Sequence, residues 1–160
     1  MRTYNGGTAM RTYLVVIDEG EESRVALRFA ARRAAKTGGA IEILALVAPA
    51  EFVQWGGVQA AMEEEAQLRA EALVAQAAGE LIEETGLRPT ITVRQGEPVE
   101  VVRAILEDRP DTAALVVGAP AGGAPSPLLA YVAGIDAGSM PCPVMIIPGS
   151  LGDEALDRLS

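Results

Sequence analysis

The segment from Leu115 to Val132 reads LVVGAPAGGAPSPLLAYV and passes from one apolar run, through a loop rich in glycine and proline, into another. Glycine lets a backbone come close to an anion, and the N–H groups at the start of a following helix can bind a phosphate. Gly118, Gly122, Gly123 and Ser126 are therefore candidate phosphate-binding residues.

The same loop also contains features that disfavour tight phosphate binding. Pro120, Pro125 and Pro127 have no N–H group to donate. No lysine or arginine occurs between Arg109 and Arg158, and the chain has no Gly-Lys-Ser or Gly-Lys-Thr sequence of a P-loop. A dinucleotide-binding sequence would follow the first strand, where DEGEES stands instead.

The composition disfavours several other kinds of chemistry. The chain has no histidine and a single cysteine, Cys142, which lies in an apolar segment and is expected to be inert. We therefore expect no catalytic residues and no metal ligands. The net charge is −9, and the 13 basic residues are scattered among 22 acidic ones, so neither nucleic acid nor an anionic membrane is an expected partner.

Strand and helix patterns alternate along the chain. Short apolar runs predict strands, and longer segments with apolar residues at helical spacing, opened by proline or ended by glycine, predict helices. The predicted strands are 13–18, 40–47, 90–96, 112–118 and 142–147, and the predicted helices are 22–39, about 60–85, 98–109 and 126–138. This order predicts an α/β fold: a doubly wound five-stranded parallel sheet with helices on both faces.

Ligands of such sheets bind beyond the carboxyl ends of the strands, where the strand order reverses. This rule points to Asp18, at the end of the first strand, and to the loop that follows the fourth strand. Phe52 and Trp55, in the loop after the second strand, could cover the resulting cleft, anchor an interface or pack against the domain.

The length of 160 residues suits one domain. The apolar runs are too short to span a bilayer and the N-terminus lacks an apolar signal core, so a cytoplasmic location is expected. The sequence MRTY occurs at Met1 and again at Met10, which suggests that residues 1–10 are a leader. The domain would then cover 11–149, followed by a tail, 150–160, that could form helical turns.

Three longer sequences resemble those of the universal stress protein family, and they occur in the same order. They are YLVVIDEGEESRVALRFAARRAA from Tyr13, RQGEPVEVVRAILEDRPDTAALVVGAP from Arg94 and MPCPVMIIP from Met140. The resemblance covers Arg11 to about Gly149 and implies a nucleotide-binding α-hydrolase-like fold with strand order 3-2-1-4-5. For members that bind ATP, it implies that Asp18 and the backbone near Val47 contact the nucleoside, with the loop from Gly118 taking the phosphates.

The phosphate loop of that family has a glycine, two residues, a second glycine, nine residues, and then glycine with serine or threonine. Counted from Gly118, Ala121 stands at the second glycine, and Tyr131 and Val132 stand at the final pair. Counting back from Cys142 gives Ala130 and Tyr131 instead. Neither register restores the small residue and the hydroxyl group, which predicts weak or absent ATP binding.

Each candidate residue also has a purely structural interpretation. Asp18 could stabilise the start of the helix that follows it. The glycines at 118, 122 and 123 could only allow the strand to turn into a helix, and Ser126, just before Pro127, is favoured as a helix N-cap.

The function expected from these observations is a non-catalytic stress-response or regulatory module of the universal stress protein kind. One alternative is an ATP- or AMP-binding member with slow hydrolysis, which would use Gly122, Gly123 and Ser126 in a rearranged loop. A second alternative is a small enzyme on a flavodoxin-like sheet, such as a flavin or nucleotidyl-transfer protein. The lack of histidine and of a phosphate signature disfavours the enzyme.

The last predicted strand, Cys142 to Ile147, is expected at an edge of the sheet. Its apolar residues alternate between two faces that both need burial, and Pro143 cannot donate to a central ladder. Pairing with a second copy about a two-fold axis would cover this edge, and the tail with Leu151, Leu156 and Leu159 could pack over the seam. The resemblance to universal stress proteins implies the same homodimer.

Overall fold

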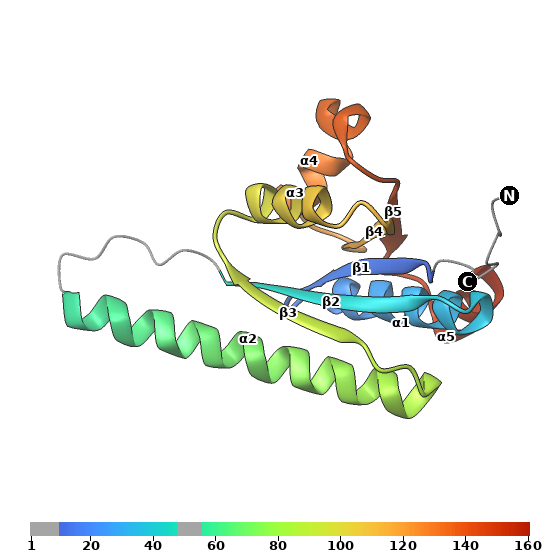
Figure 1. The fold of residues 1–160 in the computed structure, drawn as a ribbon, viewed down its shortest axis with the longest axis horizontal. Helices are drawn as coiled ribbons and strands as arrows, with labels where there is room; N and C mark the ends of the chain where they lie inside the picture. Colours follow the sequence, from blue (N-terminus) through green and yellow to red (C-terminus); the bar gives the residue numbers. More distant parts are fainter. Residues whose placement is uncertain (1–9, 48–55) are drawn as a thin grey trace, which may run out of the picture.

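A computed structural model describes residues 10–47 and 56–160 of the chain (Figure 1). The predicted leader lies outside the described residues, apart from Met10. The elements are β1 (Thr12–Ile17), α1 (Glu21–Thr37), β2 (Ala40–Val47), α2 (Gly56–Thr85), β3 (Thr90–Gln95), α3 (Pro98–Asp108), β4 (Thr112–Ala119), α4 (Pro127–Val132), a 3-10 helix η1 (Ile135–Ser139), β5 (Val144–Pro148) and α5 (Asp153–Leu159).

The five strands form one parallel sheet in the order β3-β2-β1-β4-β5. The predicted fold class and strand order are therefore confirmed. After β3 the chain returns across the sheet to place β4 beside β1, so the strand order reverses between β1 and β4. Ligands of doubly wound sheets bind at this reversal, beyond the carboxyl ends of the strands.

Helices cover both faces of the sheet. One apolar cluster joins the sheet to α1, α2 and α5, and the other joins it to α3 and α4 (Figure 1). Strand β1 contributes to both, because Tyr13, Val15 and Ile17 face the first cluster while Leu14 faces the second. Burial on both sides explains why the central strands read as nearly continuous apolar runs. Among residues 10–47 and 56–160, no helix is both long and apolar enough to cross a membrane.

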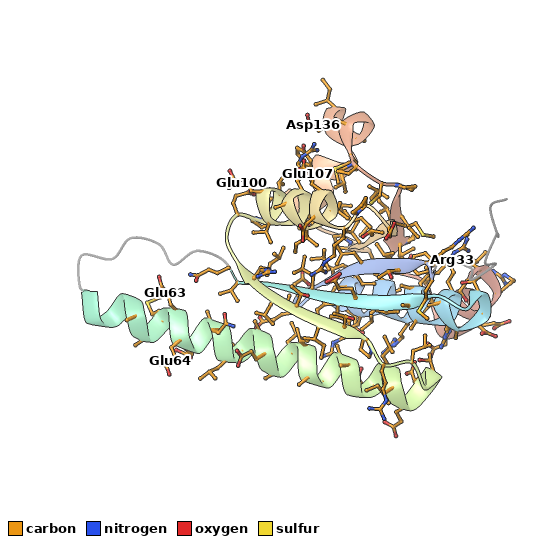
Figure 2. All side chains as sticks on the ribbon, viewed as in Figure 1. Arg33, Glu63, Glu64, Glu100, Glu107 and Asp136 are labelled. Carbon is orange, nitrogen blue, oxygen red and sulfur yellow. The ribbon has the colours of Figure 1, made fainter. Side chains whose placement is uncertain are left out.

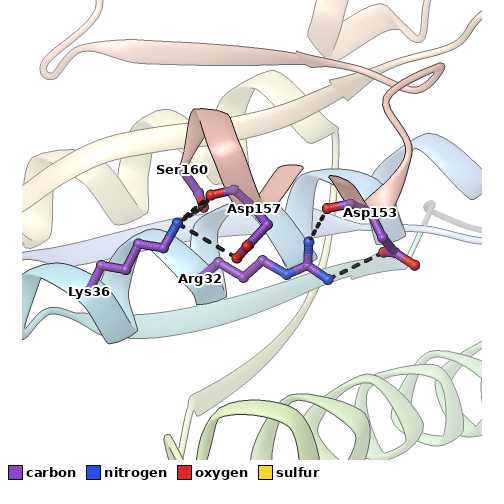
Figure 3. Close-up of polar contacts among 5 residues, drawn as sticks. All are labelled: Arg32, Lys36, Asp153, Asp157 and Ser160. Atoms are coloured by element: carbon purple, nitrogen blue, oxygen red, sulfur yellow. Dashed lines mark hydrogen bonds and ion pairs between the residues drawn. The ribbon is translucent and has the colours of Figure 1, made fainter. Parts of the chain in front are cut away.

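Helix α5 is docked on α1 by polar contacts at its rim and by one buried leucine beneath (Figure 3). Arg32 donates to the backbone oxygen of Asp153 at 2.7 Å and to its carboxylate at 3.3 Å. Lys36 donates to the backbone oxygen of Asp157 and to the hydroxyl of Ser160. Leu156, between these contacts, is fully buried in the α1-side cluster.

The structure differs from the prediction over residues 126–138. One helix was expected there, but α4 ends at Val132 and η1 follows as a separate 3-10 turn. Gly134 separates them in an extended conformation, and the alanine- and glycine-rich sequence around it gains little from a longer helix. Figure 2 shows Asp136 on η1, away from the sheet, and Ile135 beside it is 99% exposed.

Strand β5 begins at Val144, two residues later than predicted, because Pro143 has no N–H group for the ladder. Pro143 still accepts a hydrogen bond from the backbone N–H of Leu115 at 2.9 Å. The predicted edge position is confirmed, since β5 pairs only with β4.

Candidate functional site

A cleft of about 530 Å³ lies beyond the carboxyl ends of β1 and β2. The buried side chains of Ile17, Ala45 and Val47 form its floor at the strand ends, and α2 contributes a wall that includes the partly exposed Leu73. Figure 1 shows why α2 can form this wall: its N-terminal half extends past the end of β2. The cleft therefore lies in the region that the fold makes available to a ligand.

The turn between β1 and α1 holds Asp18 at this cleft. The carboxylate of Asp18 accepts a hydrogen bond from the N–H of Gly20 at 2.7 Å. The buried hydroxyl of Ser23 has the backbone oxygens of Gly20 (2.9 Å) and Asp18 (3.1 Å) as acceptors for its one hydrogen, and it accepts from the N–H of Asp18 at 3.2 Å. Asp18 therefore stabilises the turn and at the same time lines the cleft.

The charged groups that line the cleft are mostly acidic. Asp18, Glu19 and Glu22 contribute three carboxylates, and Arg69 contributes one guanidinium. Arg69 forms an ion pair with Glu65, one turn earlier on α2, at 3.4 Å. Glu63 and Glu64 also lie on the part of α2 that extends past β2 (Figure 2). This distribution favours a neutral or cationic ligand over a polyphosphate.

Gly118 has a clear packing role at the end of β4. A Cβ atom at this position would come within 2.2 Å of the backbone oxygen of Glu22, in the first turn of α1. Gly149 plays a related role, because a Cβ there would lie 2.9 Å from the Cβ of Glu22. The ends of β4 and β5 therefore need glycine for α1 to rest on them.

The loop after β4 is exposed and is organised by its own turns. Gly123 has a φ of 90°, which favours glycine, and a Cβ at Gly122 would meet no atom within 4 Å. Ser126 accepts a hydrogen bond from the N–H of Leu129 at 3.1 Å and so caps α4. This cap is the structural role expected as the alternative to phosphate binding.

Tyr131 and Val132, which the count from Gly118 puts at the family's final Gly-Ser or Gly-Thr pair, are used to pack α4. Val132 is 2% exposed, within the α3-side cluster. The hydroxyl of Tyr131 accepts a hydrogen bond from Arg103 of α3 at 3.1 Å. Both side chains thus hold α4 against α3 and leave no small residue with a hydroxyl at this point.

The structure divides the sequence-predicted site residues into two groups. Asp18 and Val47 line the same cleft. Gly118, near the end of β4, and Gly122, Gly123 and Ser126, in the loop after it, do not line that cleft. Phe52 and Trp55 lie outside the described residues. Sequence reasoning missed Glu22 and Arg69, although Glu22 stands four residues after Asp18 in the acidic sequence DEGEES.

A buried carboxylate, that of Glu42, lies near the amino end of β2 and is structural. Glu42 is 3% exposed; it forms an ion pair with Arg109, just after α3, and accepts a hydrogen bond from Thr92 of β3 at 2.9 Å. These contacts satisfy the buried carboxylate and join the end of α3 to the sheet.

The described residues include no group of three or more cysteine, aspartate or glutamate side chains that could hold a metal ion. Cys142 is partly buried, and this burial raises the pKa of its thiol, while a backbone hydrogen bond from Leu115 lowers it by less. The thiol is therefore protonated at neutral pH and is a poor nucleophile.

Comparison with known proteins identifies the family of this chain. The sequence model of the universal stress protein family matches residues 10–148, so the chain belongs to this family. A comparison with curated proteins finds no match.

Solved structures of universal stress proteins share the fold at low sequence identity. The protein UspA from Lactobacillus plantarum has a TM-score of 0.73 at 16% identity, over 86% of this chain and 97% of its own. A protein from Archaeoglobus fulgidus, solved in complex with dAMP, has a TM-score of 0.51 at 18% identity, over 86% of this chain and 97% of its own. A protein from Arabidopsis thaliana with AMP bound has a TM-score of 0.53 at 18% identity, over 90% of this chain and 94% of its own.

Proposed function

We propose that this chain is a non-catalytic stress-response or regulatory module whose cleft binds ATP weakly or not at all. The observation that carries this proposal is the packing of Tyr131 and Val132. In a phosphate loop of this family their positions would supply a close backbone and a hydroxyl, whereas here they fix α4 to α3.

The electrostatics of the cleft support the same proposal. A triphosphate entering between β1 and α2 would meet the carboxylates of Asp18, Glu19 and Glu22. Among the lining residues that the structure describes, Arg69 is the one cation, and it already pairs with Glu65. Like charges a few Å apart disfavour binding by about 1 kcal/mol each even in water.

Thermal unfolding with and without magnesium ATP tests this proposal. We expect millimolar ATP to raise the melting temperature little or not at all. Saturation at 100 times the dissociation constant would stabilise the fold by about 2.7 kcal/mol, which is several degrees for a domain of this size. A shift that large, abolished by Asp18→Ala, would overturn the proposal.

An ATP- or AMP-binding member with slow hydrolysis is the second candidate. It is favoured by the position of Asp18 and Val47 in one cleft, and by the AMP and dAMP bound to two proteins of the same fold. Phosphate contacts would then have to come from the exposed loop at Gly122 and Gly123. The serine or threonine hydroxyl of the family's loop is replaced by Val132, which is buried, or by Tyr131, which is hydrogen-bonded to Arg103.

We also propose that the chain forms a homodimer through β5. Support comes from the edge position of this strand and from Ile146, which is 40% exposed on it. An exposed apolar edge strand is an aggregation risk unless another strand pairs with it. Leu151 and Leu156 of the tail pack on the α1-side cluster of their own chain. The cytoplasmic location expected from the sequence stays a prediction.

A further inference from the structure

We infer that the open edge of β3, with the groove between β3 and α3, binds an extended peptide that carries a carboxylate side chain. The peptide would add to the sheet as a further strand and place alternate side chains in the groove. This edge lies at the opposite end of the sheet from β5. The inference goes beyond the proposed function, because it depends neither on the contents of the cleft nor on dimerisation through β5.

Strand β3 has unpaired backbone groups along one side. In the described part of the chain it pairs only with β2, at the end of the sheet (Figure 1). The N–H and C=O groups of successive strand residues point to alternate sides, and the N–H of Gly96 donates to the oxygen of Val47 on β2 at 3.1 Å. The even-numbered residues of β3 therefore face β2. Ile91, Val93 and Gln95 present their N–H and C=O groups to the open edge.

This edge lacks the features that commonly protect an exposed strand from pairing. Its sequence, TITVRQ, contains no proline and no lysine, and its pairing with β2 runs without a bulge. Ile91 is 48% exposed on it. An extended peptide can therefore pair along the whole strand.

A groove of about 370 Å³ lies beside this edge, between β3 and α3. Its α3 wall includes Val101, Ala104 and Ile105, and its β3 wall consists of Arg94 and Gln95. A groove between an edge strand and a helix suits an added strand, because every second side chain of that strand points into the groove.

Side-chain directions on β3 show which residues would contact the peptide side chains in the groove. Thr92 donates to Glu42 at 2.9 Å, and Glu42 forms an ion pair with Arg109, just after α3. Thr92 therefore faces the α3 side of the sheet, and so does Arg94, two residues later. Peptide side chains on this face would lie next to Arg94 and against the apolar residues of α3.

The charges of the groove favour a carboxylate at that place. Arg109 is already paired with the buried Glu42. Arg94 is exposed and forms no ion pair with any residue that the structure describes. Asp108, which also lines the groove, is the last residue of α3 rather than part of the strand. A charged peptide side chain beside β3 would therefore meet Arg94, which binds carboxylates.

Fluorescence anisotropy with the full chain and a labelled peptide, Thr-Val-Thr-Val-Thr-Glu-Thr with blocked ends, tests the inference. We expect saturable binding, and lysine in place of the glutamate should weaken it about two- to fivefold. Two further peptides carry N-methyl groups on one or the other alternate set of residues. One set should lose at least about tenfold in affinity and the other little, because only one set of N–H groups points to β3.

The variant Gln95→Pro separates backbone pairing from side-chain contact. Proline removes the N–H at the open edge but leaves the hydrogen bonds to β2, so the fold should persist. We expect this variant to bind the peptide at least about fivefold more weakly. Gln95→Thr keeps the N–H and is the matched control, with wild-type affinity. Arg94→Gln should remove the preference for the glutamate peptide over the lysine peptide.

Every outcome bears on the inference. Equal binding of the two methylated peptides, or wild-type affinity in a folded Gln95→Pro protein, would overturn strand addition; the methylated peptides decide this even if Gln95→Pro folds poorly. An unchanged preference in Arg94→Gln would overturn the assignment of the carboxylate to Arg94. Absence of saturable binding at millimolar peptide would overturn the whole inference and leave the proposals on ATP and on β5 standing. If Gln95→Pro, unlike Gln95→Thr, lowers the mass in light scattering, a second copy occupies this edge and the peptide is overturned as its occupant.

Discussion

At the scale of single residues, the start of α1 depends on the absence of a side chain at Gly118. We expect Gly118→Ala to lower the free energy of unfolding by about 2–4 kcal/mol, because its Cβ would overlap the backbone oxygen of Glu22. Gly122→Ala is the control, since no atom lies within 4 Å of its added Cβ, and it should change stability by less than about 0.5 kcal/mol. Urea denaturation measures both. Equal effects would show that α1 does not press on Gly118.

Of the residues that line the cleft, Asp18 and Val47 could be predicted from the sequence and Glu22 could not. Asp18 and Val47 end buried apolar runs, so their meeting at the carboxyl ends of neighbouring strands follows from the parallel sheet. Glu22 could not be placed in the same way. Its place at the cleft depends on how closely α1 approaches β4, and that distance is set by Gly118 and Gly149, which are far from Glu22 in the sequence.

At the scale of elements, α5 is held on α1 by one buried side chain more than by its ion pairs. We expect Leu156→Ala to lower the free energy of unfolding by about 2–4 kcal/mol, because Leu156 is fully buried in the α1-side cluster. Lys36→Ala should cost less than about 1 kcal/mol, since its contacts with Asp157 and Ser160 lie at the exposed rim (Figure 3). A larger loss for Lys36→Ala than for Leu156→Ala in thermal or urea unfolding would contradict this account.

The elements themselves were predicted well where apolar periodicity is strong, as in α1, β2 and β4. Prediction was poorer from Ser126 to Gly138, where a helical start signal, Ser126 with Pro127, precedes a sequence with weak helical preference. The start signal is local, and α4 begins at Pro127, where this signal predicts. The end depends on Gly134, which lies in an extended conformation between α4 and η1. Glycine has a low helix preference, so the helix does not continue past the packed residues Tyr131 and Val132.

At the scale of the whole molecule, the two edges of the sheet allow a matched test of assembly. Ile146 on β5 and Ile91 on β3 are 40% and 48% exposed, respectively. If the chain dimerises through β5, Ile146→Lys should give monomer or aggregate, while Ile91→Lys should keep twice the chain mass in light scattering after size-exclusion chromatography. A folded wild-type monomer at tens of micromolar, or dissociation by Ile91→Lys alone, would place the interface elsewhere or remove it.

We propose that the cleft of this protein does not retain nucleotides, although two universal stress proteins of the same fold were solved with AMP or dAMP bound. The most direct measurement is mass spectrometry of the small molecules released when freshly purified protein is denatured. Weak or absent ATP binding predicts no adenine nucleotide in stoichiometric amount. About one ATP, ADP or AMP per chain would contradict the claim, because such a ligand must bind tightly enough to survive purification.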